Sequence, residues 1–267
     1  MIVKKFKRRL KYELSCIQFN YSKRRRKKYN IELNINDVKK ELASLNSEHQ
    51  YFHHYFWNLS PKWLKEHRDY FSKDKRGFGE DAFHAMWYFI FNEFNPKQVL
   101  EIGVYRGQTI SLFSLLANKF GFTCEIHGIS PFTSAGDKVS VYLKNLDYEN
   151  DVKTNFNYFN LPSPILHKGF STDEEMIKII ESKQWDLIYI DGNHDYEVAK
   201  QDFNISSKNI KKGGLIVLDD ASLNTEYKPA FYSTAGHPGP SKVASEIDLN
   251  SFEEIFSVGH NRIFKKL

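Results

Sequence analysis

Cysteine is scarce in this sequence: Cys16 and Cys124 are the only two in 267 residues. Their spacing fits no metal-ligand motif and implies no disulfide framework. Long apolar runs are also missing, since no stretch approaches the ~20 residues of a membrane span. The basic N-terminus is not followed by the apolar segment of a signal peptide. These absences predict a soluble protein of the reducing cytoplasm.

The rest of the composition is that of an ordinary globular protein. With 41% hydrophobic residues, the chain is long enough to bury one sizeable α/β core. We expect three segments: a basic N-terminal arm over residues 1–30, a helical, aromatic-rich cap over residues 31–79, and a catalytic domain over residues 80–267.

Positive charge is concentrated in the arm. Residues 1–30 hold twelve Lys or Arg and one acid, Glu13, so the arm carries +11, and the net charge of +5 leaves 5 − 11 = −6 for the remainder. A nucleic-acid enzyme would place its basic surface beside the catalytic residues, so no nucleic-acid partner is expected. The arm is either a solvated basic helix or a weak contact to an anionic membrane surface around Leu10, Tyr12, Leu14 and Ile17.

Residues 32–97 alternate helix-like patterns with aromatic clusters. Apolar residues between Phe83 and Phe94 recur at the spacing of one buried helix face, and Asn95-Pro96 ends that helix. The aromatic excess over residues 51–94 suggests a homodimer surface. His53, His54 and His84 lie among these aromatics, where histidines are usually packed side chains and not metal ligands.

From residue 98 onward, short apolar runs alternate with amphipathic helices, the pattern of a parallel sheet covered on both faces. The expected strands are residues 98–103, 124–129, 164–168, 186–191 and 214–219. Two further runs meet at Gly259-His260-Asn261 and predict an antiparallel hairpin at the sheet edge. The fold class is therefore α/β, a Rossmann-like, doubly wound, seven-stranded sheet with a C-terminal hairpin and a helical N-terminal extension.

The first strand ends in "VLEIGVYRGQT", which places Glu101 before Gly103 and Gly107. Glycine at these positions allows a tight turn into a helix and a close approach of a ligand to the backbone. On its own the pattern also fits an ordinary strand-to-helix turn. Together with the hairpin it resembles the E-x-G-x-x-x-G motif of class I S-adenosylmethionine-dependent methyltransferases, and Glu101 would then face the ammonium group of that cofactor.

The segments "DLIYIDGNHDY" and "GGLIVLDD" extend the resemblance to metal-dependent O-methyltransferases of bacterial sugar and secondary metabolism, the macrocin-type group with a D-G-x-H-x-Y box. The resemblance implies one divalent cation, Mg²⁺ by its oxygen ligands, on Asp191, Asp219 and Asp220. It implies S-adenosylmethionine as the other cofactor, held by residues of the strand ends. These are Glu101, Gly103, Tyr105, Gly107, Thr109, Ser130, Ser171 and Asp191.

Ser130 departs from the pattern of these relatives. They usually end the second strand with an acid that accepts both ribose hydroxyls, whereas "HGISPF" supplies a neutral hydroxyl. The change keeps a non-catalytic, cofactor-binding homologue open as an alternative.

A second alternative comes from Gly192-Asn193-His194-Asp195, which matches the "GNHD" box of calcineurin-like metallophosphoesterases. Those enzymes also need a D-x-H and a G-H-x-H motif to build a two-metal site. No D-x-H occurs in this chain. His194 is therefore expected to be the catalytic base beside Asp191, or else to orient the loop.

The reaction that the resemblance implies is methyl transfer to an acceptor hydroxyl, of a sugar or glycosylated small molecule first and of a catechol-like phenol second. Residues 222–242, rich in Gly, Pro and aromatics, predict an ordered lid without helix over the acceptor. Its expected acceptor-binding residues are Tyr227, Phe231, Tyr232 and His237.

Overall fold

The computed structural model describes residues 2–22, 29, 31–42, 44–140 and 142–267. Its centre is a seven-stranded sheet in the order β3-β2-β1-β4-β5-β7-β6. The strands are β1 Gln98–Ile102, β2 Glu125–Ser130, β3 Ile165–Lys168, β4 Trp185–Ile190, β5 Ile210–Leu218, β6 Phe252–Val258 and β7 Asn261–Lys266. Pairs among β1 to β5 are parallel, and β7 runs antiparallel to both neighbours. The predicted fold class, with five parallel strands and a terminal hairpin, is confirmed.

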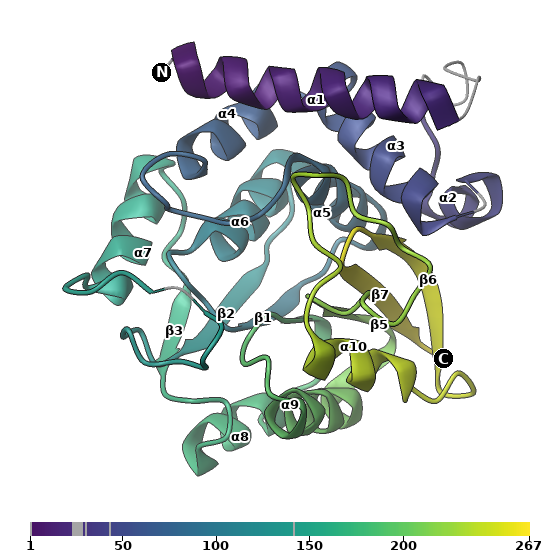
Figure 1. Cartoon of the computed structure of the whole chain (residues 1–267). Coiled ribbons are helices and arrows are strands. Elements are labelled where there is room, and N and C mark those ends of the chain that lie inside the picture. The colour runs from purple at the N-terminus through teal and green to yellow at the C-terminus, as the bar shows by residue number, and fades with distance from the viewer. Residues whose placement is uncertain (1, 23–28, 30, 43, 141) are drawn as a thin grey trace.

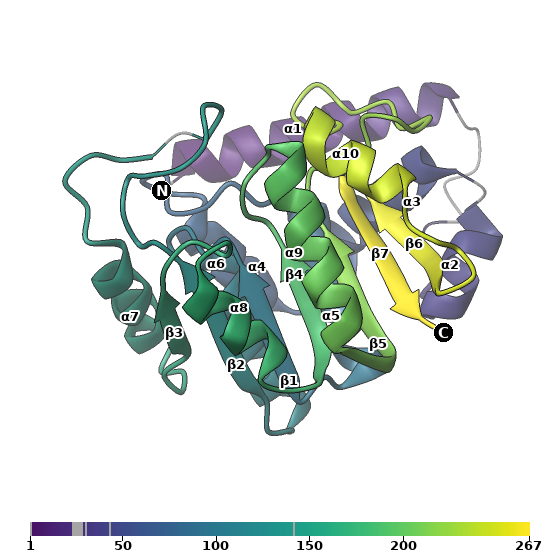
Figure 2. The ribbon, with the colours of Figure 1, turned by 90° about the horizontal axis from the view of Figure 1, so that it is seen from below.

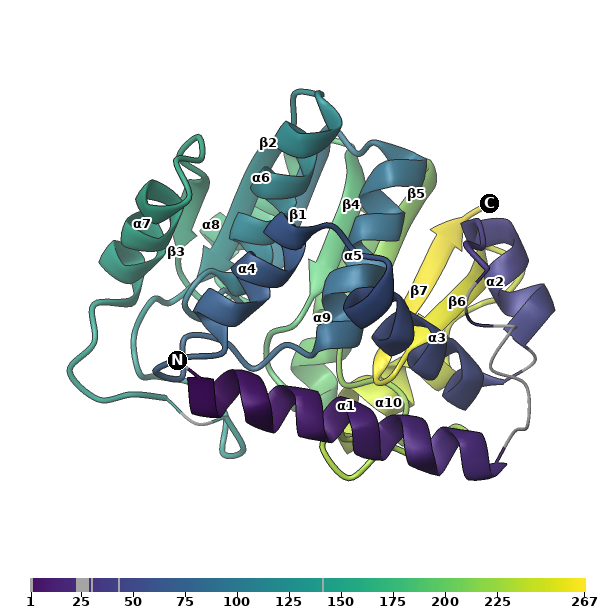
Figure 3. The ribbon, with the colours of Figure 1, turned by 90° about the horizontal axis from the view of Figure 1, so that it is seen from above.

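Helices cover both faces of the sheet, as buried parallel strands require. On one face lie α5 Asp81–Phe94, α6 Gln108–Phe120 and α7 Tyr148–Tyr158, seen in Figure 3. On the other lie α8 Glu174–Glu181, α9 Tyr196–Asn209 and α10 Pro238–Ser245, seen in Figure 2. Alternate residues of the strands feed two separate apolar cores, one under each helical layer. The helix predicted up to Phe94 is present and ends at Asn95 in a left-handed conformation.

The prediction of a lid without helix is wrong over its last part, because α10 begins at Pro238. Proline fits the first turn of a helix, because the backbone N–H groups of that turn have no hydrogen-bond acceptor within the helix. Gly239 lets this turn pack closely on the loop after β4: a Cβ there would lie 2.1 Å from the backbone oxygen of His194. The Gly and Pro content thus marks a close-packed helix start.

The aromatic cap forms α2 Ile35–Leu42, α3 Leu45–Asn58 and α4 Lys62–Phe71. Its large rings face the interior: Tyr51, Phe52 and Phe56 are fully buried, and Phe52 stacks on Phe256 of β6. The aromatic excess that suggested a dimer surface is therefore used within the chain. The homodimer itself stays a prediction.

The N-terminal arm forms the long helix α1 Ile2–Ser22, which lies over α3 and α4 (Figure 1). Arg8 forms an ion pair with Asp81 at 2.9 Å and a second one with Asp69. Tyr12 is buried against Trp57. The helix is thus packed on the body along one side. The basic run of residues 23–28 lies outside the described residues. Within the described part of the chain, no helix is both long and apolar enough to cross a membrane.

Candidate functional site

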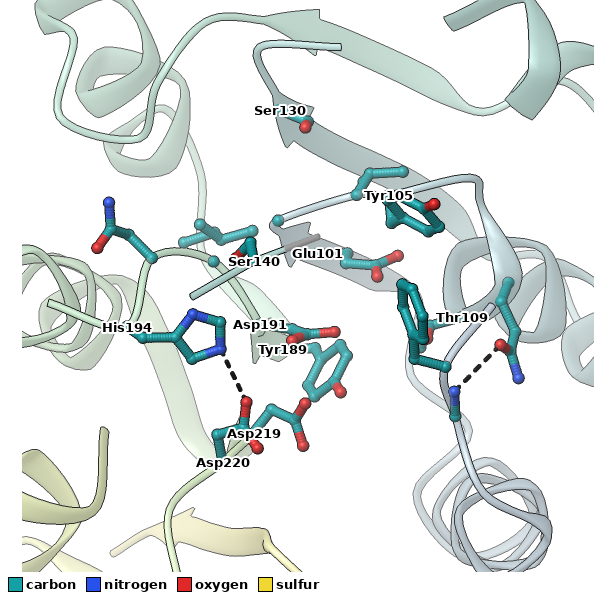
Figure 4. A pocket seen from close by; sticks show the side chains of 18 of the residues that line it. Glu101, Tyr105, Thr109, Ser130, Ser140, Tyr189, Asp191, His194, Asp219 and Asp220 are labelled. Atoms are coloured by element: carbon teal, nitrogen blue, oxygen red, sulfur yellow. Dashed lines mark hydrogen bonds and ion pairs between the residues drawn. The ribbon is translucent and has the colours of Figure 1, made fainter. Parts of the chain in front are cut away.

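Three adjacent strands bring carboxylates together at their carboxyl ends. Glu101 lies near the end of β1, Asp191 directly follows β4, and Asp219 directly follows β5. The sheet bonding continues past the strand ends, since Asp191 N donates to Ile102 O at 2.8 Å and Asp219 N donates to Ile190 O at 3.0 Å. The side chains consequently point into one crevice, the usual ligand position of open parallel sheets (Figure 4).

This crevice is a cavity of about 720 Å³. Nearly all of the expected cofactor residues line it: Glu101, Gly103, Tyr105, Thr109, Ser130, Ser171 and Asp191. Gly107 does not line the cavity; it is the N-cap of α6, with φ +80°, and a Cβ there would approach Val152 of α7 at 3.1 Å. Its role is to start the helix close to its neighbour.

Gly103 lines the cavity and also has a structural role. Its φ is +104°, and a Cβ would lie 1.9 Å from the backbone oxygen of Asp191. The glycine is needed because the chains leaving β1 and β4 touch at this point. A side chain here would push apart the two strand ends before it could obstruct a ligand.

Glu101 is a buried acid without a full set of partners. Burial raises the pKa of Glu101 to about 8, with a backbone hydrogen bond from Ile110 opposing the shift and the charge of Asp219 adding to it. Its Oε2 makes no hydrogen bond although it is buried. A buried carboxylate of this kind is costly unless a cation joins it. The ammonium group of an amino-acid-like ligand would supply that charge.

Asp191 and Asp219 form a coupled pair. Burial raises the pKa of Asp191 well above its usual range, and the neighbouring charge of Asp219 raises it further. Burial also raises the pKa of Asp219, and Asp219 Oδ1 makes no hydrogen bond. Two carboxylates so close share a proton unless a cation replaces it.

Asp220 lies beside this pair in a strained backbone conformation, with φ +52°. Three histidines approach it: His194 Nε2 is 2.8 Å and His237 Nε2 is 3.8 Å from Asp220 Oδ2, and His260 Nε2 is 3.8 Å from Asp220 Oδ1. Burial raises the pKa of Asp220, but the hydrogen bond from His194 and the charge of His260 outweigh burial and hold this pKa below its usual value. A non-glycine residue at positive φ is often a functional position.

His194 is held between two carboxylates. Its Nδ1 is 2.5 Å from Asp137 Oδ2, and its Nε2 faces Asp220 (Figure 4). Burial lowers the pKa of His194, but the hydrogen bonds to Asp220 and Asp137 outweigh burial and raise it to about 9. The imidazole is therefore protonated at neutral pH while Asp220 keeps its full charge. A base role requires that Nε2 lose its proton and separate from Asp220.

Three residues beside the strand-end carboxylates were not predicted from the sequence. Asp137 comes from the loop after β2, and its carboxylate accepts from both the backbone N and the ring of His194. His260 comes from the β6–β7 turn and places Nε2 at 3.3 Å from Asp219 Oδ1. Tyr189, at an inward position of β4, lies beside Asp219 in Figure 4. Loops and turns have no periodicity, so no sequence signal marked the first two; Tyr189 was hidden in an apolar run.

The loop before α10 contributes part of the expected acceptor side. Phe231, Tyr232 and His237 line the cavity. Tyr227 is not among its lining residues, because its ring packs edge-on against His49 and its hydroxyl lies 3.2 Å from Ser233 Oγ. Tyr227 therefore supports the loop from behind.

The residues at the strand ends fit a divalent cation. Asp219 Oδ1 is buried and makes no hydrogen bond, although His260 Nε2 lies 3.3 Å away, and the pKa values of Asp191 and Asp219 are raised; the pair therefore has excess negative charge. Within the described part of the chain, the groups with ligand spacing are Asp219, Asp220 and His260, and His194, Asp220 and His237. Asp219 and Asp220 of the expected ligand set are in them, and Asp191 lies against Asp219. The imidazoles broaden the donor set beyond the expected carboxylates.

The GNHD box does not build a phosphoesterase centre. It forms the loop between β4 and α9, and Asn193 uses its side-chain oxygen to accept from Asp195 N at 2.7 Å. Asn193 belongs to neither group with ligand spacing. The box is thus a turn that carries His194 into the cavity.

The fold is an open α/β sheet with a ligand cavity at its strand ends, and comparisons with known proteins show what the chain is similar to. Residues 100–221 match the model of a family described as "Methyltransferase domain". An uncharacterised protein of Acanthamoeba polyphaga mimivirus is 30% identical over 157 residues, which cover 57% of this chain and 62% of that protein. The chain therefore matches less than two thirds of that relative's length.

Two solved structures share the fold. An O-methyltransferase from Bacillus cereus in complex with SAH has a TM-score of 0.55 at 14% identity, over 80% of this chain and 94% of that one. A putative caffeoyl-CoA O-methyltransferase from Staphylococcus aureus has a TM-score of 0.54 at 13% identity, over 77% and 92%. Residues 100–221 thus match a methyltransferase-domain model, and the predicted Rossmann-like fold is the one that these two structures have.

Proposed function

We propose that the chain transfers the methyl group of S-adenosylmethionine to a hydroxyl of a sugar or glycosylated small molecule, with a divalent cation at the strand ends. One observation carries the proposal: Glu101, Asp191, Asp219, Asp220 and His194 converge in a single cavity. This arrangement combines a carboxylate for the cofactor's ammonium group, a charged site for a cation, and a proton acceptor.

S-Adenosylmethionine supplies an activated methyl group, so the protein has only to position the acceptor oxygen and remove its proton. Glu101 is placed to bind the ammonium group, and Tyr105, whose buried hydroxyl has no partner, offers a further polar contact. Ser130 is the last residue of β2, where it would face the ribose. These groups would set the methyl donor along the carboxyl ends of β1 and β2.

Asp191, Asp219 and Asp220 are the residues that would hold the cation, with His260 beside them; such an ion lowers the pKa of a hydroxyl bound to it. Asp137 orients His194 through Nδ1, leaving Nε2 toward Asp220 and the cavity. A carboxylate that shares its charge with a cation attracts the imidazole proton less. With a cation bound there, the pKa of His194 would fall toward the range of a general base.

The acceptor side combines aromatic faces with polar groups. Trp87, Phe231 and Tyr232 line the cavity together with Glu80 and His84. Flat rings with nearby hydrogen-bonding groups suit the alternating apolar and hydroxyl surfaces of a sugar. A catechol-like phenol is the second candidate, since its adjacent hydroxyls also suit a cation-binding site.

The proposal is tested by measuring methyl transfer and phosphate-ester hydrolysis in parallel, with and without a chelator. We expect methyl transfer to depend on Mg²⁺ or another divalent ion and to be lost in Asp219→Asn. His194→Ala should lower turnover by roughly 10² to 10⁴, with partial recovery at high pH, where hydroxide replaces the base. Full methyl transfer in excess chelator would show that the reaction needs no cation. Phosphate-ester cleavage by the wild type that is lost in His194→Ala would favour the phosphoesterase instead.

Ser130 favours a second candidate, a protein that binds the cofactor without transferring its methyl group. A neutral hydroxyl binds a ribose diol less strongly than a carboxylate does. The two candidates differ in a single-turnover assay with labelled methyl donor and a panel of sugar and phenol acceptors. Cofactor binding without label transfer to any acceptor would favour the non-catalytic protein.

A further inference from the structure

Helix α1 presents its apolar residues to solvent, the reverse of an ordinary surface helix. Its exposed apolar residues follow one another at intervals of three or four, which places them on a single stripe along the helix. This outer stripe consists of Val3, Phe6, Leu10, Leu14 and Ile17, whose exposed fractions run from 44% to 66%. Isolated exposed apolar residues are common, but five in register along one helix form a contact surface.

The opposite side of α1 fixes this orientation. Arg8 reaches inward to Asp81 at 2.9 Å and lies 5.5 Å from the ring centre of Phe56. Tyr12 and Ser15 are buried. Rotating the helix to bury the outer stripe would break a buried ion pair, which is strongly unfavourable. The stripe thus faces outward because the polar side is the one that binds the body.

Basic side chains flank the stripe, and their charge indicates what kind of partner the stripe can bind. Lys4, Lys5, Lys7, Arg9 and Lys11 are all exposed on α1. They belong to an arm of charge +11, whereas the remaining chain carries −6. A second copy of the helix would bring two such arms together and meet strong repulsion. A nucleic acid would pair with the charges but leave the apolar stripe uncovered. An anionic lipid surface satisfies both features, as it does for interfacial amphipathic helices.

We propose that α1 is a docking surface for an anionic membrane, with the outer stripe at the acyl boundary and the flanking Lys and Arg among the headgroups. This contact lies next to the catalytic cavity. Ser15 Oγ is 3.2 Å from the hydroxyl of Tyr232, and Lys11 Nζ lies 6.0 Å from the ring centre of Tyr232. Tyr232 lines the cavity, and α1 runs beside the loop that leads into α10 (Figures 2 and 3). Docking would therefore hold the acceptor side near the lipid surface.

The test is flotation of the full chain with vesicles of phosphatidylcholine alone or with about one third phosphatidylserine, at low and high salt. Wild type should bind the anionic vesicles and be released by salt. Phe6→Gln with Leu10→Gln and Ile17→Gln should weaken binding at least roughly tenfold. Lys4→Gln with Lys5→Gln and Lys7→Gln should weaken it roughly 10- to 100-fold at low salt.

Matched controls separate the stripe from general changes in apolarity and charge. Leu249→Gln removes an equally exposed apolar residue elsewhere, and a triple Gln variant of Lys144, Lys208 and Lys212 removes three exposed charges away from α1. Both controls should bind like wild type. Because all substituted side chains are exposed, the variants should also keep the wild-type melting temperature.

Three results would overturn the proposal, and none depends on methyl transfer. If the wild type did not bind anionic vesicles, a membrane would be excluded as the partner of α1. Sedimentation showing a wild-type dimer that the stripe variant turns into a monomer would identify a second copy as the occupant. Binding to duplex DNA or RNA that is lost in both α1 variants would assign the surface to nucleic acid.

Discussion

Single residues at the strand ends carry both the architecture and the chemistry of this protein. Gly103 is a structural requirement, since its positive φ and its approach to Asp191 leave no room for a side chain. Glu101 costs stability, since it is an acid buried without a partner for Oε2, and in the proposed function it would bind the cofactor's ammonium group. The two residues are two positions apart, yet replacing Gly103 should destabilise the folded state and replacing Glu101 should stabilise it.

Gly103→Ala should lower the free energy of unfolding by about 2 kcal/mol or more, because a left-handed conformation and a steric clash add together. Gly213→Ala is the matched control: Gly213 also has a positive φ, +78°, but a Cβ there meets nothing within 4 Å. Its cost should be about 1 kcal/mol. Urea unfolding of the two variants compares them, and equal costs would refute the close contact of β1 and β4.

Glu101→Gln should stabilise the ligand-free protein increasingly as the pH rises from about 5 to 8. The pKa of Glu101 is raised to about 8 in the folded chain by burial. Between its unfolded and folded pKa values the unfolded state has lost the proton and the folded state keeps it. Wild-type stability therefore falls with pH, by up to about 1.4 kcal/mol per unit. Thermal unfolding at several pH values checks this, and parallel curves for variant and wild type would contradict it.

At the scale of elements, the strands could be predicted from the sequence, but the loop and turn residues that join them at the site could not. Short apolar runs identify β1, β2, β4 and β5, because both faces of a parallel sheet are buried. The acids after β4 and β5 could be assigned to one crevice by the same argument. Asp137 and His260 could not, since a loop and a hairpin turn reach the site only through the tertiary fold. Helix α10 was missed because Gly and Pro commonly mark loops.

Helix α1 is the element for which the structure changes the expectation most. A remote arm could be deleted without effect, but Arg8 and Tyr12 of this helix are packed on the cap. Deleting residues 1–30 would leave the buried carboxylate of Asp81 with Arg68 alone as its ion-pair partner among the described residues. Truncation should therefore destabilise the fold, and point substitutions are the cleaner test.

Arg8→Ala should lower the free energy of unfolding by about 3 kcal/mol, the usual cost of removing one partner from a buried ion pair. Arg9→Ala is the control on the next residue, whose ion pair with Glu13 is half-exposed. Its cost should stay within about 1 kcal/mol. Chemical denaturation of both variants is the measurement. A cost for Arg8→Ala no larger than for Arg9→Ala would show that α1 is not docked through Asp81.

At the scale of the whole molecule, negative and positive charges lie in different places. The acidic body concentrates carboxylates in the cavity at the carboxyl ends of β1, β4 and β5. The basic helix α1 lies outside that cavity and contacts Tyr232 of its lining. Cofactor binding should therefore depend on the cavity and be insensitive to the substitutions that disrupt docking.

Titration calorimetry with S-adenosylhomocysteine tests the central claim most directly, because it asks only whether the cavity is a methyl-donor site. The wild-type chain should bind with micromolar or better affinity, Glu101→Ala should weaken binding by at least roughly tenfold through loss of a charge-assisted contact, and NAD should not bind. If Glu101→Ala kept the wild-type affinity, Glu101 would not be the residue that binds the ammonium group. No binding of S-adenosylhomocysteine by the folded wild type, or binding of NAD in its place, would contradict the account.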